Sequence, residues 1–260
     1  MSKQDIHTPE RWAEILKKQA EFTKKYRYNL YEKVSIQNKK NILDVGCGTG
    51  AVTEDIISLS EGYVTGIDID IKKLEYAKSL ISDRVAFLKA DVLDLPFPDN
   101  TFDLVTFCIV LTHITEQQNA VNEMVRVTQK GGIVLATLEP DYEGSFSYPE
   151  NRADHVFRKF FEDNEIERYT GRKLRYFFVK AGLKTEIGLY TDILDHQNEE
   201  KDIEKEIENY LKNFERSAQL LSDYGWTTEE IEEYKLENIE LIKKDLAFSF
   251  CPCFYAIGRK

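Results

Sequence analysis

The chain has 260 residues, of which 42% are hydrophobic and 31% are charged, as in an ordinary soluble protein with one sizeable core. Its net charge of −11 argues against broad electrostatic binding to nucleic acid or to an anionic membrane. The sequence has no apolar run near the ~20 residues that a membrane span needs, and its polar N-terminus lacks the apolar core of a signal peptide. We therefore expect a cytoplasmic protein.

The number and spacing of the cysteines argue against a disulfide framework and against a metal site. The four cysteines, Cys47, Cys108, Cys251 and Cys253, are too few and too scattered for a disulfide framework. Cys251 and Cys253 flank a proline in a strand-like C-terminal run, and no second Cys/His pair stands at a zinc spacing. We expect free thiols and no metal site.

Residues 8–34 are predicted to form an amphipathic helix. Thr8 and Pro9 supply an N-cap and a first-turn proline, and apolar and aromatic residues then recur at three- and four-residue steps, Trp12 and Tyr26 among them. The helix either packs on the core or forms a lid whose inner face closes over a ligand, and both roles are compatible.

A glycine loop follows the first predicted strand, Ile42–Val45. Three glycines alternate at Gly46, Gly48 and Gly50, and helical spacing resumes at once. Strand, glycine loop and helix start let the backbone approach a ligand closely and aim free N–H groups at it. Asp44 adds a carboxylate at the mouth of this loop, which favours a cationic ligand over a bare phosphate.

The next two strands also end in acidic residues. Asp68 closes the strand that begins at Tyr63, 18 residues beyond Gly50, close to the spacing of a ribose-binding carboxylate. Asp70 fits the cap of the helix that follows. Asp91 follows the third strand, Val85–Leu88, and is our candidate for the exocyclic amine of an adenine, while Asp94 belongs to the adjacent turn.

The remaining pattern predicts a parallel sheet. Strands at 102–107 and 133–138 enclose a helix at 116–128, with Lys130-Gly131-Gly132 as its stop. Strands alternating with helices indicate an α/β fold with helices on both faces of the sheet. In such folds the ligand lies at the carboxyl ends of the strands, where the candidate residues fall.

Five ordered motifs resemble those of class I S-adenosylmethionine-dependent methyltransferases, and the small-molecule branch of ubiquinone and menaquinone biosynthesis enzymes is the most similar. The motifs are Leu43–Gly50, Gly66–Asp68, Ala90–Phe97, Phe102–Val105 and Lys130–Gly132, and they cover about residues 38–140. The resemblance implies a Rossmann-like, mostly parallel sheet of seven strands with an antiparallel last strand. It implies S-adenosylmethionine as cofactor and S-adenosylhomocysteine as product.

The resemblance also implies roles for individual residues. Asp44 and the glycine loop would contact the methionine moiety, Asp68 the ribose, and Asp91 and Val92 the adenine. The candidate cofactor-binding residues are Asp44, Gly46, Cys47, Gly48, Gly50, Asp68, Ile69, Asp91, Val92, Cys108 and Tyr26.

A nicotinamide-dependent dehydrogenase is the main competing enzyme class, because the glycine loop followed by Ala51 also satisfies G-x-G-x-x-G/A. Asp44 would repel a pyrophosphate, however, and a second acid, Asp91, ends the third strand. Helical material also precedes the first strand. A catalytically silent S-adenosylmethionine-binding protein would carry the same cofactor motifs and stays open.

Residues 139–190 are expected to hold the substrate, and residues 141–194 are assigned as the substrate half of the domain. The loop at 139–149 is rich in aromatic and acidic residues, and Glu139, Tyr142 and Tyr148 are candidate substrate contacts unless the loop is only a surface turn. Helices are predicted at 155–166 and 171–181, followed by a sixth strand at 184–190. Positions 152–184 carry nine basic and five acidic residues, which form either a modest basic face toward an acidic substrate or a solvated surface.

An acidic insertion separates this half from the last strand. Residues 195–245 contain 16 acidic and 7 basic residues and two amphipathic stripes, the second starting at Thr227 with a capping-box pattern and Trp226 at the joint. We expect a helical cap over the substrate mouth or a homodimer surface, before a last strand at 247–257. The whole chain is interpreted as one methyltransferase domain.

Methyl transfer from a sulfonium is an in-line displacement, so positioning supplies most of the catalysis. A general base is needed only if the acceptor must lose a proton. His113, just after the fourth strand, is the best-placed candidate, although capping or packing at a helix start is its alternative role. Our hypothesis is that His113 or Tyr142 touches a small organic acceptor, whose nucleophile is an oxygen, nitrogen or carbon.

Overall fold

The computed structural model describes residues 9–78, 83–190 and 202–260. Its main sheet has seven strands in the order β3-β2-β1-β4-β5-β9-β7. Strands β1 to β5 run parallel, and β9 is antiparallel to both of its neighbours, β5 and β7. These strands are β1 Asn41–Val45, β2 Tyr63–Asp68, β3 Val85–Lys89, β4 Phe102–Cys108, β5 Thr128–Pro140, β7 Lys184–Leu189 and β9 Cys253–Arg259.

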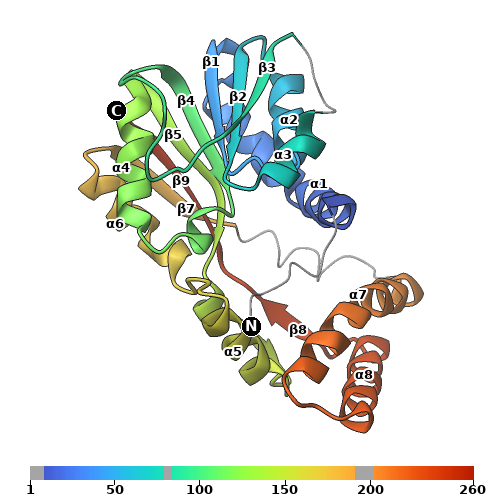
Figure 1. The fold of residues 1–260 in the computed structure, drawn as a ribbon. Helices are drawn as coiled ribbons and strands as arrows, with labels where there is room; N and C mark the ends of the chain where they lie inside the picture. The colour runs from blue at the N-terminus through green and yellow to red at the C-terminus, as the bar shows by residue number, and fades with distance from the viewer. Residues whose placement is uncertain (1–8, 79–82, 191–201) are drawn as a thin grey trace.

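Helices cover both faces of this sheet, as Figure 1 shows. The α-helices are α1 Pro9–Lys33, α2 Ala51–Leu59, α3 Ile71–Ala77, α4 Gln117–Val127, α5 Asp154–Asp163, α6 Thr170–Lys180, α7 Ile203–Asp223 and α8 Thr228–Lys243. Short 3₁₀ turns are η1 Ile36–Asn38, η3 Leu111–His113 and η4 Tyr142–Gly144. No helix in these described ranges is long and apolar enough to cross a membrane.

Two hydrophobic cores lie on opposite faces of the sheet. Helices α4 and α6 pack against one face around Leu43, Val45 and Phe178. Helix α1 and helix α2 cover the other face, where Ile42 and Tyr31 are buried. Because side chains alternate along a strand, Asp44 points to the same face as Ile42, toward α1 and α2. The alternation therefore decides which helices surround the candidate carboxylate.

A third, smaller core joins the insertion to the rest of the chain. Val156 of α5 and the preceding Ala153 pack with Phe214 and Leu221 of α7 and Tyr234 of α8. In Figure 1 these helices lie beyond the C-terminal end of β5, beside the antiparallel ribbon of β6 Phe146–Tyr148 and β8 Phe248–Phe250. The predicted insertion is helical where it is described, and its residues 195–201 lie outside the described residues.

The predicted fold class is confirmed, including the N-terminal helix and the antiparallel last strand. Two expected caps are also present: Asp70 accepts from the Lys72 N–H, and Thr227 forms a capping box with Glu230. The cap predicted at Thr8 and the helix end predicted at Leu80 lie outside the described residues.

The single last strand predicted over 247–257 is wrong. It divides into β8, which pairs with β6, and β9, which joins the main sheet. Pro252 separates them, and a proline cannot donate the N–H that a continuing ladder needs. Strand β5 also begins at Thr128 instead of after the Gly131-Gly132 stop, because helix α4 already ends at Val127.

Candidate functional site

The glycine loop joins β1 to α2 in a backbone conformation that glycine favours. Gly46, Gly48 and Gly50 have φ values of 68°, 55° and 85°, where residues with a Cβ are strained. Space is also short, because a Cβ added at Gly46 would lie 2.5 Å from Val110 Cγ2. The N-cap residue of α2 is Gly50, which has no side chain to cap the first N–H groups of the helix. This is the arrangement that binds ligands at a helix N-terminus.

Asp44 lies at the end of β1 and is only 2% exposed. The Thr53 hydroxyl, from the first turn of α2, donates to its Oδ2 at 2.6 Å. Burial raises the pKa of Asp44 to about 7, although the Thr53 hydrogen bond and the charge of Arg27 oppose that rise. A buried carboxylate with so few partners favours a cation in contact with it.

Helix α1 supplies the other polar groups around Asp44. The fully buried Arg27 side chain donates to Thr23 and to Asp55 of α2. Burial strongly raises the pKa of the neighbouring Tyr31 phenol, and the charge of Asp44 adds to this effect. Thr53, Arg27 and Tyr31 are not among the site residues predicted from the sequence. The only sequence signal for Arg27 was a basic residue on the apolar stripe of the helix.

Asp68 ends β2 beside the glycine loop. Its Oδ2 accepts from the Gly48 N–H at 2.8 Å, and its Oδ1 accepts from the Asp70 N–H at 2.9 Å. The carboxylate thereby connects the loop to the start of α3. The exposed Ile69 side chain follows it directly. The loop and both carboxylates, Asp44 and Asp68, thus lie together at the carboxyl edge of the sheet.

Asp91 and Val92 follow β3 at the same edge. Asp91 is exposed and its Oδ1 accepts from the Leu93 N–H at 2.9 Å, whereas Val92 is buried in the core under α4. Cys108 ends β4 and packs against the core on the α1 face. Tyr26 is buried in that core, with its ring 4.6 Å from the ring of Tyr190.

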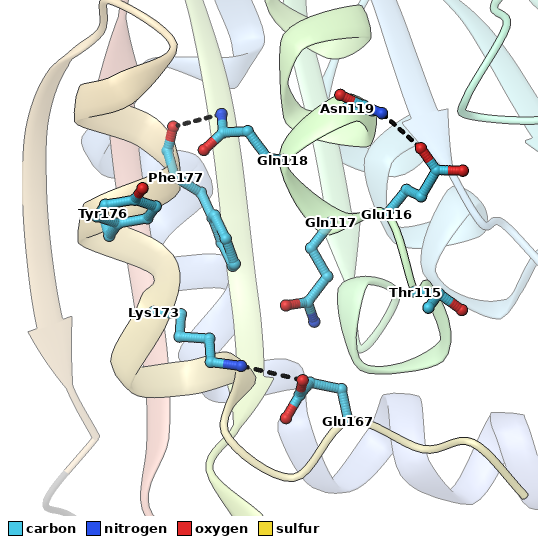
Figure 2. Close-up of a pocket in the computed structure, with 9 residues that line it drawn as sticks. All are labelled: Thr115, Glu116, Gln117, Gln118, Asn119, Glu167, Lys173, Tyr176 and Phe177. Atoms are coloured by element: carbon cyan, nitrogen blue, oxygen red, sulfur yellow. Dashed lines mark hydrogen bonds and ion pairs between the residues drawn. The ribbon is translucent and has the colours of Figure 1, made fainter.

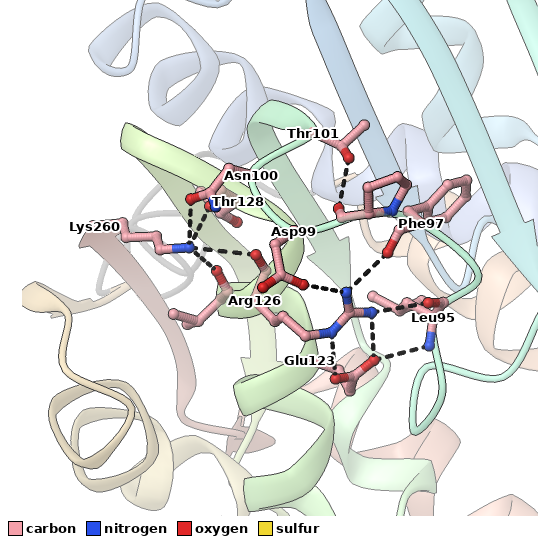
Figure 3. Close-up of polar contacts among 11 residues, drawn as sticks. Leu95, Phe97, Asp99, Asn100, Thr101, Glu123, Arg126, Thr128 and Lys260 are labelled. Carbon is pink, nitrogen blue, oxygen red and sulfur yellow. Dashed lines mark hydrogen bonds and ion pairs between the residues drawn. The ribbon is translucent and has the colours of Figure 1, made fainter.

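The turn after Val92 is held by Arg126 of α4. The guanidinium donates to the carbonyls of Leu95 and Phe97 and to the carboxylates of Asp99 and Glu123. Figure 3 shows the Arg126 guanidinium reaching across this turn. Nearby, the Lys260 ammonium donates a hydrogen bond to the Val125 carbonyl at the end of α4. The contacts fix the segment that continues from the candidate adenine residues.

His113 lies in η3, after β4. The residue is exposed, yet desolvation by its surroundings lowers its pKa, the charge of Lys73 adds to this, and the charge of Asp68 opposes it. These electrostatic partners place His113 near the same edge as the glycine loop. A neutral imidazole at pH 7 can accept a proton.

Glu139 is fully buried at the end of β5. Its carboxylate accepts from three consecutive N–H groups, Val110 at 2.7 Å, Leu111 at 3.2 Å and Thr112 at 3.4 Å. Burial raises the pKa of Glu139 to about 7, although the three hydrogen bonds lower it. In this structure the carboxylate therefore holds the turn that carries His113.

Tyr142 and Tyr148, the other candidate substrate contacts, differ in their surroundings. The Tyr142 ring stacks on Phe161 at 4.6 Å between centroids, and burial raises the pKa of its phenol. Its neighbour Asp141 is anchored by Arg172, whose Nε donates to Oδ2 at 2.5 Å. Tyr148 is 75% exposed on β6. The structure thus places only Tyr142 against other aromatic side chains.

Two pockets lie near this edge. One, of about 470 Å³, is formed by the N-terminal ends of α4 and α6. Figure 2 shows its Glu167–Lys173 ion pair and the Gln118 amide directed at the Phe177 carbonyl, and none of the predicted site residues line it. The other, of about 310 Å³, is lined by Tyr142 together with residues of α5 and β8. Within the described residues, no group of three His, Cys, Asp or Glu side chains is arranged to hold a metal ion.

The sheet order distinguishes this fold from the dehydrogenase alternative. A dinucleotide-binding sheet continues as 3-2-1-4-5-6 with parallel strands, whereas here the antiparallel β9 lies between β5 and β7. Residues 43–136 match the sequence model of the methyltransferase-domain family.

Similar proteins are also methyltransferases by name. An ajmaline N-methyltransferase of Rauvolfia serpentina is 31% identical over 46% of this chain and 44% of its own length. A demethylmenaquinone methyltransferase of a Geobacillus species is 32% identical over 46% of this chain and 55% of its own length. The chain therefore spans about half the length of these curated relatives.

Solved structures show the same architecture. The crystal structure named as a putative sarcosine dimethylglycine methyltransferase from Galdieria sulphuraria superposes with a TM-score of 0.61 at 16% identity, over 92% of this chain and 85% of that one. At this identity the likeness concerns the fold alone. The family match thus identifies residues 43–136 as a methyltransferase domain, and the sheet order with the structural likeness shows that the described chain has the corresponding fold.

Proposed function

We propose that this protein transfers the methyl group of S-adenosylmethionine to a small organic acceptor. The observation that carries the proposal is the meeting of the glycine loop, Asp44 and Asp68 at one edge of a methyltransferase-type sheet. The named relatives support a small acceptor but differ in which one, since one is named for ajmaline and another for demethylmenaquinone.

In this proposal the cofactor extends along the carboxyl ends of β1, β2 and β3. Asp44 attracts the positively charged methionine end, and the loop N–H groups and the α2 start receive its carboxylate. Asp68 accepts from the ribose hydroxyls in place of its bond to Gly48. Asp91 and Val92 flank the adenine, and Ile69, Cys108 and Tyr26 complete the pocket walls.

The chemical step is an in-line displacement. A lone pair on the acceptor forms a bond to the methyl carbon while the carbon–sulfur bond breaks, and the sulfur keeps the bonding pair as a thioether. An acceptor that carries a proton releases it during this step. The protein's main task is to hold the nucleophile ~3 Å from the methyl carbon and to exclude water.

His113 is the residue best suited to receive such a proton. Its lowered pKa keeps the imidazole neutral at pH 7, and Glu139 fixes the turn that carries it. Tyr142 is a poorer base, because its raised pKa keeps the phenol protonated. We assign Tyr142 a contact with the acceptor through its ring, and we keep Tyr148 as a contact at the outer rim.

Helix α1 acts as the lid in this account. A Cβ at Gly48 would lie 3.0 Å from Leu16 Cδ1, and Lys73 of α3 lies 4.7 Å above the Trp12 ring. The first half of α1 therefore covers the glycine loop, so entry of a cofactor requires it to move. The acidic α7–α8 pair packs on α5 and forms the cap of the acceptor side.

The test is incubation with methyl-labelled S-adenosylmethionine and a metabolite extract, divided into small-molecule and macromolecular fractions. We expect S-adenosylhomocysteine to form and the label to enter a small molecule. Cofactor binding without S-adenosylhomocysteine formation would instead support the catalytically silent alternative. Label in the macromolecular fraction would contradict the small acceptor.

A further inference from the structure

None of the candidate cofactor-binding residues lines the pocket beside Tyr142. It measures about 310 Å³ and lies between the 142–151 segment, helix α5 and strand β8. We call it the aromatic pocket and define it by Tyr142, Ser147, Phe157, Phe161 and Phe250. Its volume is within the range of pockets that enclose small organic ligands.

Segments distant in sequence build this pocket. Strand β6 pairs with β8 so that Phe146 lies opposite Phe250, about 100 residues later in the chain. The residue before Tyr142, Asp141, is held in place because Arg172 and the Gly144 N–H both donate to its carboxylate. The walls are thus held by backbone pairing and by an ion pair, so the pocket is formed before a ligand arrives.

Five of the thirteen residues that line the pocket are aromatic. The Tyr142 and Phe161 rings stack at an angle of 23°, and Phe146 lies 5.7 Å from Phe250 across the ribbon. Flat aromatic ligands gain from stacked or edge-to-face contacts with such walls beyond the apolar area that they bury.

One polar atom in the lining has no partner. The Ser147 hydroxyl oxygen is buried and makes no hydrogen bond with any of the described residues. A buried hydroxyl left unpaired is unfavourable, so a ligand group that bonds to Ser147 is favoured in the pocket.

The two arginines that line the pocket are paired with carboxylates, and Asp154 is a third charged residue in the lining. Arg158 donates to Glu143 Oε1 at 2.7 Å, and Arg168 lies 3.5 Å from Glu143 Oε2 and 3.3 Å from Glu162. Both guanidinium groups therefore already have carboxylate partners. This arrangement favours a neutral ligand over a strongly anionic one.

The pocket is also connected to the candidate transfer site. Tyr142 follows Asp141 directly, and Glu139, two residues earlier, accepts from the Val110 N–H. Val110 in turn touches the Gly46 position of the glycine loop. These contacts link the segment that carries Tyr142 to the glycine loop.

We propose that the aromatic pocket binds the methyl acceptor, and that this acceptor is a neutral, planar aromatic molecule with a hydrogen-bonding group directed at Ser147. The assignment rests on the proposed methyltransferase function and adds the chemical class of the substrate.

The test measures binding of two probes, 2-naphthol and 2-methylnaphthalene, which have similar shape but differ in the hydroxyl group. The full chain is compared with Phe161→Leu, which removes a ring face but keeps an apolar side chain, and with Ser147→Ala. The control is Tyr176→Ala, because Tyr176 is an exposed aromatic residue that lines the other pocket. Circular dichroism verifies that each variant is folded.

We expect Phe161→Leu to weaken both probes by about fivefold through lost stacking. Ser147→Ala should weaken 2-naphthol by about fivefold but 2-methylnaphthalene by less than about twofold, and Tyr176→Ala should change neither. Equal affinity in all four proteins, or no binding of 2-naphthol, overturns the assignment. Calorimetry with S-adenosylhomocysteine is run in parallel: if it binds while 2-naphthol does not, only the acceptor class fails, and the reverse result contradicts the methyltransferase function.

Discussion

Lowering the pH from about 7.5 to about 5.5 should weaken binding of S-adenosylmethionine by roughly 25-fold, because Asp44 must be ionised to attract the cation. Burial raises the pKa of Asp44 to about 7 in the ligand-free protein. The ionised fraction is therefore roughly three quarters at the higher pH and about 3% at the lower one, and this ratio of about 25 corresponds to about 1.9 kcal/mol.

The raised pKa of Asp44 also makes the stability of the ligand-free fold depend on pH. Since the folded-state pKa lies above the unfolded value, the ionised carboxylate destabilises the ligand-free fold, and this cost grows as the pH rises from about 4 to about 7. Asp44→Asn should therefore be neutral or stabilising without cofactor at pH 8, although it should bind S-adenosylmethionine weakly.

Isothermal calorimetry in two buffers of different ionisation enthalpy checks the binding prediction. Proton release on binding should approach one at pH 5.5 and decrease as the pH rises through 7. The Asp44→Asn variant should lose most of this dependence. An unchanged pH profile in that variant would refute the role of Asp44 in the pH dependence of cofactor binding. Another group would then be responsible, such as Glu139, whose pKa is also raised to about 7.

Three further predictions concern single residues. Gly46→Ala should abolish detectable cofactor binding by calorimetry, because the new methyl group would lie 2.5 Å from Val110 Cγ2 at a φ of 68°; adding Val110→Ala should restore part of it, and no restoration would argue against this contact. Asp68→Ala should cost at least ~1–3 kcal/mol of cofactor affinity, and unchanged affinity would mean that the ribose lies elsewhere. Arg126→Ala should lower the melting temperature by removing the fork that holds the 95–99 turn, at a cost of ~1–3 kcal/mol; a melting temperature equal to that of the parent protein would contradict this role.

The elements that could be predicted from the sequence are those with local causes. The glycine loop is visible because its positive φ angles require glycine, and the Asp70 and Thr227 caps depend on residues two and three positions away. Strand–helix alternation likewise specifies a parallel sheet before any contact is known. These features explain why the fold class and the cofactor loop could both be predicted.

The features that the sequence did not reveal depend on contacts between distant segments. The pairing of β6 with β8 joins residues about 100 positions apart, and it divides what looks like one continuous strand at Pro252. Arg27 reaches Asp55 only once α1 lies on α2. Glu139 looks like a substrate ligand in a polar loop, yet its carboxylate holds three backbone N–H groups that no local pattern indicates.

The most direct test of the central claim uses S-adenosylmethionine with a trideuterated methyl group. The protein and the labelled cofactor are incubated with a small-molecule extract, and products are followed by mass spectrometry beside an Asp68→Ala control. We expect a small aromatic product that carries the intact trideuterated methyl group, formed in equal amount with S-adenosylhomocysteine and reduced in the control. Cofactor binding without any labelled product, or the same product yield in both proteins, would contradict it.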